Sequence, residues 1–238
     1  MNAALTHQGL PSGIARKDLL LLIENLGKRG LGISSTALHV LRHYVWRSRD
    51  ADYRTGRICA VWEKVSRTAE KLELCPRAIN DAERELEGRG LIVRTTGGNG
   101  ARSGLRVGDV IRWAVGINLK PLISRYVELQ SIWEARYLHQ LAIVETRAEI
   151  RRLRRSIRDC QQLEFVDKAE AILPRGPVAP ITDLARLESI KTALELILCE
   201  LEGAVRRPKT SDASEENCRP HIQTQHTSRP CTSTPEGR

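Results

Sequence analysis

The sequence of 238 residues lacks the continuous apolar run of about 20 residues that a membrane-spanning helix needs. Its longest apolar block, DLLLLIENL, is interrupted by Glu24 and Asn25. The N-terminus also lacks the basic region, apolar stretch and cleavage site of a secretion signal. We therefore expect a soluble, cytoplasmic protein without a membrane partner.

Cysteine pairs and catalytic motifs are also missing. The six cysteines are scattered without a CxxC pair, which favours free thiols over a disulfide framework or a zinc site. The sequence has no GxxxxGK[ST] phosphate-binding loop, no nucleophile elbow and no paired acidic cluster with a metal-binding pattern. We expect no metal, no cofactor and no enzymatic activity.

Positive charge, by contrast, is in excess. Lysine and arginine outnumber aspartate and glutamate by 38 to 29, which gives a formal charge of +9 and a pI of about 9.6. Such a balance favours a polyanionic partner, either nucleic acid or a membrane surface. The length allows one core of about 100 to 150 residues together with an arm or tail.

The N-terminal third predicts two helices and a strand. Apolar residues recur at helical spacing over residues 16 to 29, and a second helix follows from a cap at Ser34 or Ser35 to about Arg47. The short apolar segment from Ile58 to Trp62 is typical of a strand.

Two short helices joined by a tight turn are predicted next. Ser66 is suited to cap the first, and Cys75 and Pro76 occupy the cap and first turn of the second, which ends near Gly88 or Gly90. Strand-like segments follow, and the glycine-rich residues 97 to 100 supply the positive φ angles of a hairpin turn. This order is that of a winged helix-turn-helix domain.

The second short helix has an apolar face, which would pack on the first helix, and an outward polar face. Arg77, Asn80 and Arg84 point outward, and this face can enter a major groove because Arg suits guanine and Asn suits adenine. Three glutamates within residues 83 to 87 dilute its positive charge.

The predicted wing is rich in arginine. Residues 89 to 106 include Arg94, Arg102 and Arg106 and no acidic residue, so the hairpin would lie along the DNA backbone or in the minor groove. Arg67 and Lys71 on the first short helix add candidate phosphate contacts.

Beyond Pro121 the pattern is that of long helices. Apolar residues from Leu122 to Cys160 follow three- and four-residue steps, the proline-rich residues 174 to 180 break the helix, and a second stripe follows from a cap near Asp183. Two helices facing each other, as a hairpin or in a homodimer, would bury both stripes. A basic stretch, residues 147 to 158, is best interpreted as a solvated face.

These patterns predict a mainly α protein. A winged helix-turn-helix DNA-binding domain occupies residues 13 to 120, a helical arm or hairpin residues 121 to 207, and a disordered C-terminal tail residues 208 to 238. The tail is rich in Ser, Thr, Pro and Gln and has too few large apolar groups to offset the entropy of ordering.

The segments ERELEGRGLI, NGARSG and GINLKPLISR resemble the N-terminal region of RepC, the replication initiator of RepABC-type plasmids. The likeness extends over about residues 13 to 129 and more loosely through the arm. It implies a winged-helix domain that binds the plasmid origin, with host replication proteins as candidate partners. It also implies a further folded domain after a polar linker, and we expect this chain to stop inside such a linker. The implied DNA contacts are Arg77, Asn80, Arg84, Asn99, Arg102 and Arg106.

Sequence-specific binding of double-stranded DNA by a plasmid replication initiator is thus the function we expect. Two other functions stay open. A winged-helix transcription regulator that dimerises through the arm would require an inverted repeat, and a helical scaffold would use its basic stripe to bind an acidic protein.

Overall fold

The computed structural model describes residues 5 to 95, 97, 101 to 172 and 178 to 206. It is mainly helical, as predicted. Asn99 and the predicted disordered tail, residues 208 to 238, lie outside the described residues, as does most of the predicted hairpin turn at residues 97 to 100. None of the described helices has both the length and the apolar character needed to cross a membrane.

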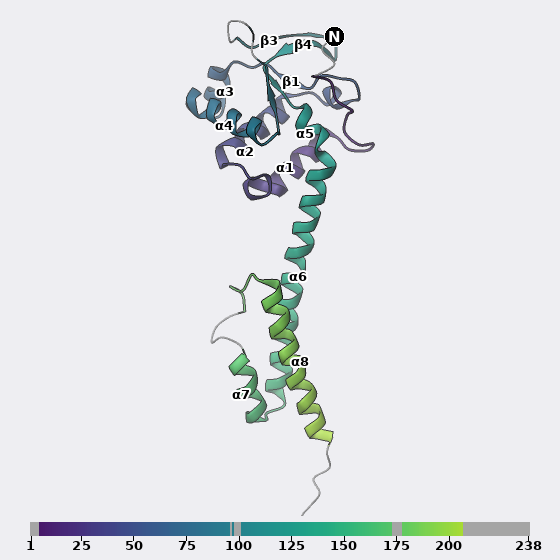
Figure 1. The fold of residues 1–238 in the computed structure, drawn as a ribbon, viewed down its shortest axis with the longest axis vertical. Coiled ribbons are helices and arrows are strands. Elements are labelled where there is room, and N and C mark those ends of the chain that lie inside the picture. The colour runs from purple at the N-terminus through teal and green to yellow at the C-terminus, as the bar shows by residue number, and fades with distance from the viewer. Residues whose placement is uncertain (1–4, 96, 98–100, 173–177, 207–238) are drawn as a thin grey trace, which may run out of the picture.

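The rounded part at the top of Figure 1, which runs from α1 to α5, is called the head. It begins with two packed helices, α1 (Arg16–Leu31) and α2 (Ser35–Arg47). Ser34 caps α2, as predicted, because its hydroxyl accepts a hydrogen bond from the amide of Ala37 at 3.1 Å. α1 is kinked at Gly27, whose φ of 58° lies in the left-handed region that glycine adopts without strain.

A helix–turn–helix follows, made of α3 (Val65–Lys71) and α4 (Pro76–Gly88). Pro76 and the cap position of Cys75 begin α4 as predicted. The prediction that Ser66 caps α3 was wrong, because α3 begins at Val65 and its N-cap is Lys64, two residues before Ser66. The turn is closed by the amide of Leu74, which donates to the carbonyl of Ala69 at 2.9 Å.

A small sheet packs beside these helices. Its strands β1 (Ala60–Val61), β5 (Ile117–Asn118) and β2 (Val93–Arg94) lie in the order β1-β5-β2 with antiparallel pairing throughout. Since β5 returns to lie between the strands on either side of the helix–turn–helix, it joins the two ends of this segment. The 3-10 helix η2 (Asp50–Tyr53) precedes β1.

The hairpin differs from the predicted one. Its strands are β3 (Ser103–Val107) and β4 (Val110–Val115), and Gly108, with a φ of 59°, lies in its turn. The prediction of one hairpin formed by the strand-like segments on either side of residues 97 to 100 was wrong, because β2 pairs with β5 and β3 pairs with β4. The strand-like segment that follows the glycine-rich residues therefore contains a separate hairpin, made of β3 and β4.

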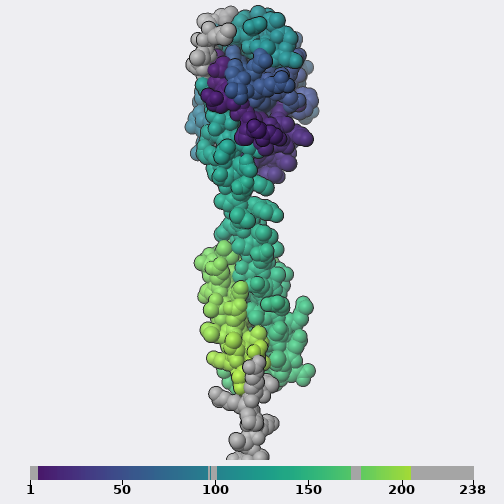
Figure 2. Space-filling view, turned by 90° about the vertical axis from the view of Figure 1, so that its right-hand side faces the viewer, coloured from purple at the N-terminus to yellow at the C-terminus, as the bar shows by residue number. Residues whose placement is uncertain are grey.

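The head core continues into the next helices. Short α5 (Lys120–Ser124) buries Leu122 and Ile123, and the first turns of α6 (Tyr126–Asp159) bury Tyr126 and Leu129 in the same cluster as α1, α2 and α4. α6 then leaves the head as a single helix, and the molecule narrows at this point (Figure 2).

A second core lies around the far half of α6. There it packs against α7 (Leu163–Ile172) and α8 (Leu184–Arg206), with Ile150, Leu187 and Leu194 fully buried. The predicted stripe of α8 is thus confirmed. α6 ends at Asp159, so the helix breaks before the proline-rich residues 174 to 180 that were predicted to break it. α7 then runs back along α6, and α8 runs parallel to α6 (Figure 1). The helices do not form the predicted two-helix hairpin.

The middle of α6 is not covered by this core. We define the α6 stripe as four exposed apolar side chains on its central turns: Tyr137, Leu138, Leu141 and Val144. In the basic stretch, Arg147 donates two hydrogen bonds to the carbonyl of Ile181, at 3.1 and 2.6 Å, whereas Arg151, Arg152 and Arg155 are exposed.

Candidate nucleic-acid interface

α4 has the two faces that its sequence predicts. Ile79, Ala82 and Leu86 are buried on one side and pack in the cluster that contains Ala69 of α3. Arg77, Asn80 and Arg84 are exposed on the opposite side, and we call these three residues the α4 face. Pro76 leaves the first turn of α4 without one amide donor and fixes its φ angle, so the helix begins sharply beside this face.

Asp81 lies within the α4 face and holds its two arginines. Its carboxylate accepts a hydrogen bond from Nη1 of Arg84 at 2.9 Å and lies 3.9 Å from Nε of Arg77. Both arginine side chains stay largely exposed, at 91% for Arg77 and 69% for Arg84. Exposed ion pairs of this kind are weak, so the two guanidinium groups are available to other anions.

The glutamates of α4 do not dilute this face, contrary to the expectation from the sequence. Glu83 points inward, Glu85 accepts hydrogen bonds from the amide and hydroxyl of Ser34 at 2.6 Å each, and Glu87 binds Arg94. Each carboxylate is therefore used in holding α4 to the rest of the head.

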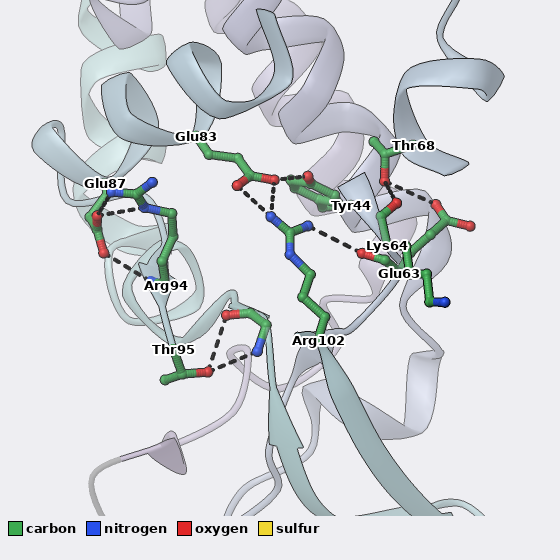
Figure 3. Close-up of polar contacts among 10 residues, drawn as sticks. Tyr44, Glu63, Lys64, Thr68, Glu83, Glu87, Arg94, Thr95 and Arg102 are labelled. Atoms are coloured by element: carbon green, nitrogen blue, oxygen red, sulfur yellow. Dashed lines mark hydrogen bonds and ion pairs between the residues drawn. The ribbon is translucent and has the colours of Figure 1, made fainter. Parts of the chain in front are cut away.

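Arg102 is mostly buried, although the sequence predicted it on an exposed wing. Its Nη2 lies 2.7 and 2.5 Å from the two carboxylate oxygens of Glu83, and Nη1 donates to the carbonyl of Glu63 at 3.2 Å (Figure 3). Only 12% of the Arg102 side chain and 1% of the Glu83 side chain are exposed. The expectation that Arg102 is exposed on a wing is thus wrong, because its guanidinium neutralises a buried carboxylate.

Tyr44 completes this buried group. Its hydroxyl donates to the Glu83 carboxylate (Figure 3). Burial, together with the charge of Glu83, raises the pKa of Tyr44, so the hydroxyl stays protonated and keeps donating. Burial by itself would lower the pKa of Arg102, but the Glu83 carboxylate outweighs it and raises the pKa.

Arg106 is held in the same way. Its two Nη atoms bind the two carboxylate oxygens of Asp52 in η2 at 2.8 and 2.7 Å, and 14% of its side chain is exposed against 1% for Asp52. The prediction of an exposed wing arginine is corrected here too. The bidentate pair instead anchors β3 to the body of the head.

The other predicted contacts are divided between the surface and internal pairs. Arg67 is exposed on α3, and Arg94 is partly buried, with its amide and Nε bound to Glu87 at 2.9 and 2.7 Å (Figure 3). Lys71 forms an ion pair with Glu63, which is also hydrogen-bonded to His43 at 2.8 Å. Asn99 lies outside the described residues.

Glu63 is the shared acceptor of this region. Burial by itself would raise the pKa of Glu63, but hydrogen bonds from Lys71 and His43 outweigh it and hold the pKa below its ordinary value of 4.5. Sequence reasoning missed Glu63, Glu83 and Asp52, because nothing local marks their partners, which are 8 to 54 positions away in the chain.

Comparison with known families identifies a match for the N-terminal part of the chain. A family model described as the replication protein C N-terminal domain matches residues 1–164, which run from the N-terminus through α6. The comparisons with curated proteins and with solved structures gave no significant match.

Replacing Arg102 with alanine should destabilise the protein by about 3–5 kcal/mol, because the Glu83 carboxylate would stay buried without a partner. Arg77→Ala, which removes a side chain that is 91% exposed, should change stability by no more than about 0.5 kcal/mol. Urea unfolding of both variants measures the difference. Equal stabilities would show that burial of Glu83 does not depend on Arg102.

Glu63 should make stability depend on acid pH. Because its pKa is lower in the folded protein than in the unfolded chain, its stabilisation is present above pH 4.5 and is lost as the pH falls through the folded pKa. The gap in free energy of unfolding between the original protein and Glu63→Gln should therefore shrink from pH 7 to pH 3. A gap that does not change with pH contradicts this role.

Proposed function

Since the chain belongs to the replication protein C family of plasmid replication initiators, we propose that it binds double-stranded DNA at a plasmid origin through α4. The observation that carries the proposal is the α4 face, which has two exposed arginines and an exposed asparagine on the second helix of a helix–turn–helix. Arg suits bidentate contact with guanine and Asn with adenine in the major groove.

The element order supports a domain of the winged-helix type. A strand precedes the helix–turn–helix, a second strand follows it, and the third strand returns between them after the β3–β4 hairpin. In this proposal the hairpin is the wing that lies against the DNA backbone. Arg112, which is exposed on β4, takes the contact role that buried Arg102 and Arg106 do not fill.

Removing either arginine of the α4 face should relax sequence preference. We expect Arg77→Ala and Arg84→Ala to reduce discrimination among duplex sites by about 1–3 kcal/mol, and Arg112→Ala to weaken all duplexes alike. Gel-shift titrations of fragments that tile the replicon encoding the chain measure this. With about four phosphates neutralised, log affinity should fall with log salt with a slope of about −4.

The matched control is Arg186→Ala, which removes the same charge from an exposed position on α8. It should leave both affinity and preference unchanged. A duplex affinity that changes neither with salt concentration nor with either α4 substitution would rule out this interface.

We further propose that the chain forms a homodimer through the α6 stripe. The stripe leaves 56%, 61%, 40% and 50% of Tyr137, Leu138, Leu141 and Val144 exposed, on the part of α6 that leads from the head into the second core. Contiguous exposed apolar side chains of this kind mark association surfaces. A dimer would suit a transcription regulator on inverted half-sites, whereas an initiator can use direct repeats or a single site, and footprinting distinguishes them.

The double variant Leu141→Glu, Val144→Glu should be monomeric in sedimentation at a concentration where the original protein is a dimer, because each dimer would bury four carboxylates in an apolar seam. Leu196→Glu is the control, since Leu196 is 62% exposed on α8, away from the stripe. A monomeric original protein would overturn self-association.

A further inference from the structure

A cleft of about 500 Å³ lies between the end of α2, the junction of β1 with α3, and β3. Its volume falls in the range of ligand-binding sites. Six cationic side chains line it: Arg47, Arg49, Lys64, Arg67, Arg102 and Arg106. We call it the Arg67 cleft. It is separate from the α4 face, because none of the three residues of that face lines it.

The cations of the Arg67 cleft exceed the anions near it. Asp52 and Glu83 neutralise the two buried arginines, and Glu63, the carboxylate on the wall, is already bound by Lys71 and His43. Nε of Arg47 is 3.8 Å from the same carboxylate.

Three further cations have weaker partners or none. Arg49 is 58% exposed and lies 3.6 Å from exposed Asp109. Within the described residues, neither Lys64 nor Arg67 has an acidic group within ion-pair distance, and both are exposed. The cleft therefore presents a positive potential to an anion.

An indole is part of the same wall. Trp62 is partly exposed, and the guanidinium carbon of Arg106 lies 5.9 Å from the centroid of its ring. Gly104 packs against the indole so closely that a Cβ there would lie 2.6–2.9 Å from three ring atoms. The hairpin thus holds the ring in place. An aromatic wall offers no favourable contact to a simple inorganic anion. A nucleotide, by contrast, has a phosphate for the cations and a base for the indole.

We propose that the Arg67 cleft binds unpaired DNA, with phosphates held by its exposed cations and a base packed against the exposed part of the Trp62 indole. Basic grooves with aromatic side chains are the recurring means of binding single strands. An unpaired base fits better than a duplex, because a paired base is covered by its stacked neighbours and must leave the stack to meet an indole. The inference rests on the proposed duplex binding and deepens it: α4 holds paired DNA while the cleft holds a strand released from it.

The test is fluorescence anisotropy with labelled (dT)12, the matching duplex and labelled dTTP, using the full chain. We expect Arg47→Ala combined with Arg67→Ala to weaken (dT)12 binding about ten-fold or more, and Trp62→Leu to weaken it about ten-fold. Trp62→Phe, which keeps an aromatic ring, should retain most of the (dT)12 affinity that Trp62→Leu loses. Arg77→Ala combined with Arg84→Ala should lower duplex affinity and leave (dT)12 affinity unchanged.

A second readout does not depend on substituting Trp62. In a variant with Trp46→Phe, Trp113→Phe and Trp133→Phe, Trp62 is the remaining indole, and (dT)12 should quench its fluorescence. Absence of quenching, or cleft substitutions that weaken only duplex or dTTP binding, overturns the strand assignment. If the original protein binds the duplex but not (dT)12, the proposal for the cleft is refuted and the proposed duplex binding stands. If it binds neither, the proposed function is refuted as well.

Discussion

Two buried ion pairs fix the β3–β4 hairpin to the helical body. An isolated two-stranded hairpin is marginally stable in water, and this one adds only Ile111 and Ala114 to a small apolar cluster, while Leu105 and Trp113 are exposed. Its orientation therefore depends on the pairs of Arg102 and Arg106 with Glu83 and Asp52. Such pairs contribute little net stability, because desolvation offsets much of their attraction, but they are costly to break and so define one arrangement.

This constraint links the hairpin to α4 itself. Glu83 and Arg84 are neighbours on the helix, yet Glu83 points inward to the hairpin and Arg84 outward to solvent. The position of the hairpin is thus set by the same helix that carries the proposed base-reading side chains. The position of the hairpin also determines the shape of the Arg67 cleft, because Arg102 and Arg106 form part of the cleft wall and Gly104 packs against the indole of Trp62.

The sequence predicted what depends on neighbouring residues. The cap at Ser34, the start of α4 at Pro76 and the exposed α4 face all follow from local spacing and local chemistry, and each was confirmed. It did not predict which strands pair, because β2 and β5 are two residues long and their register is set by tertiary packing. The burial of Arg102 was missed for a related reason: an arginine in a glycine-rich segment reads as exposed unless its carboxylate partner, 19 positions away, is known.

The long helix α6 then determines how the parts of the molecule are placed. It contributes Tyr126 and Leu129 to the head core and Ile150 to the second core, so it belongs to both. A continuous helix of 34 residues spans about 50 Å, so it sets the separation between the head and the second core. A second copy bound at the α6 stripe would therefore present its α4 at a fixed distance and orientation from the first. The spacing of any paired DNA sites would then be a property of α6, and not of either head alone.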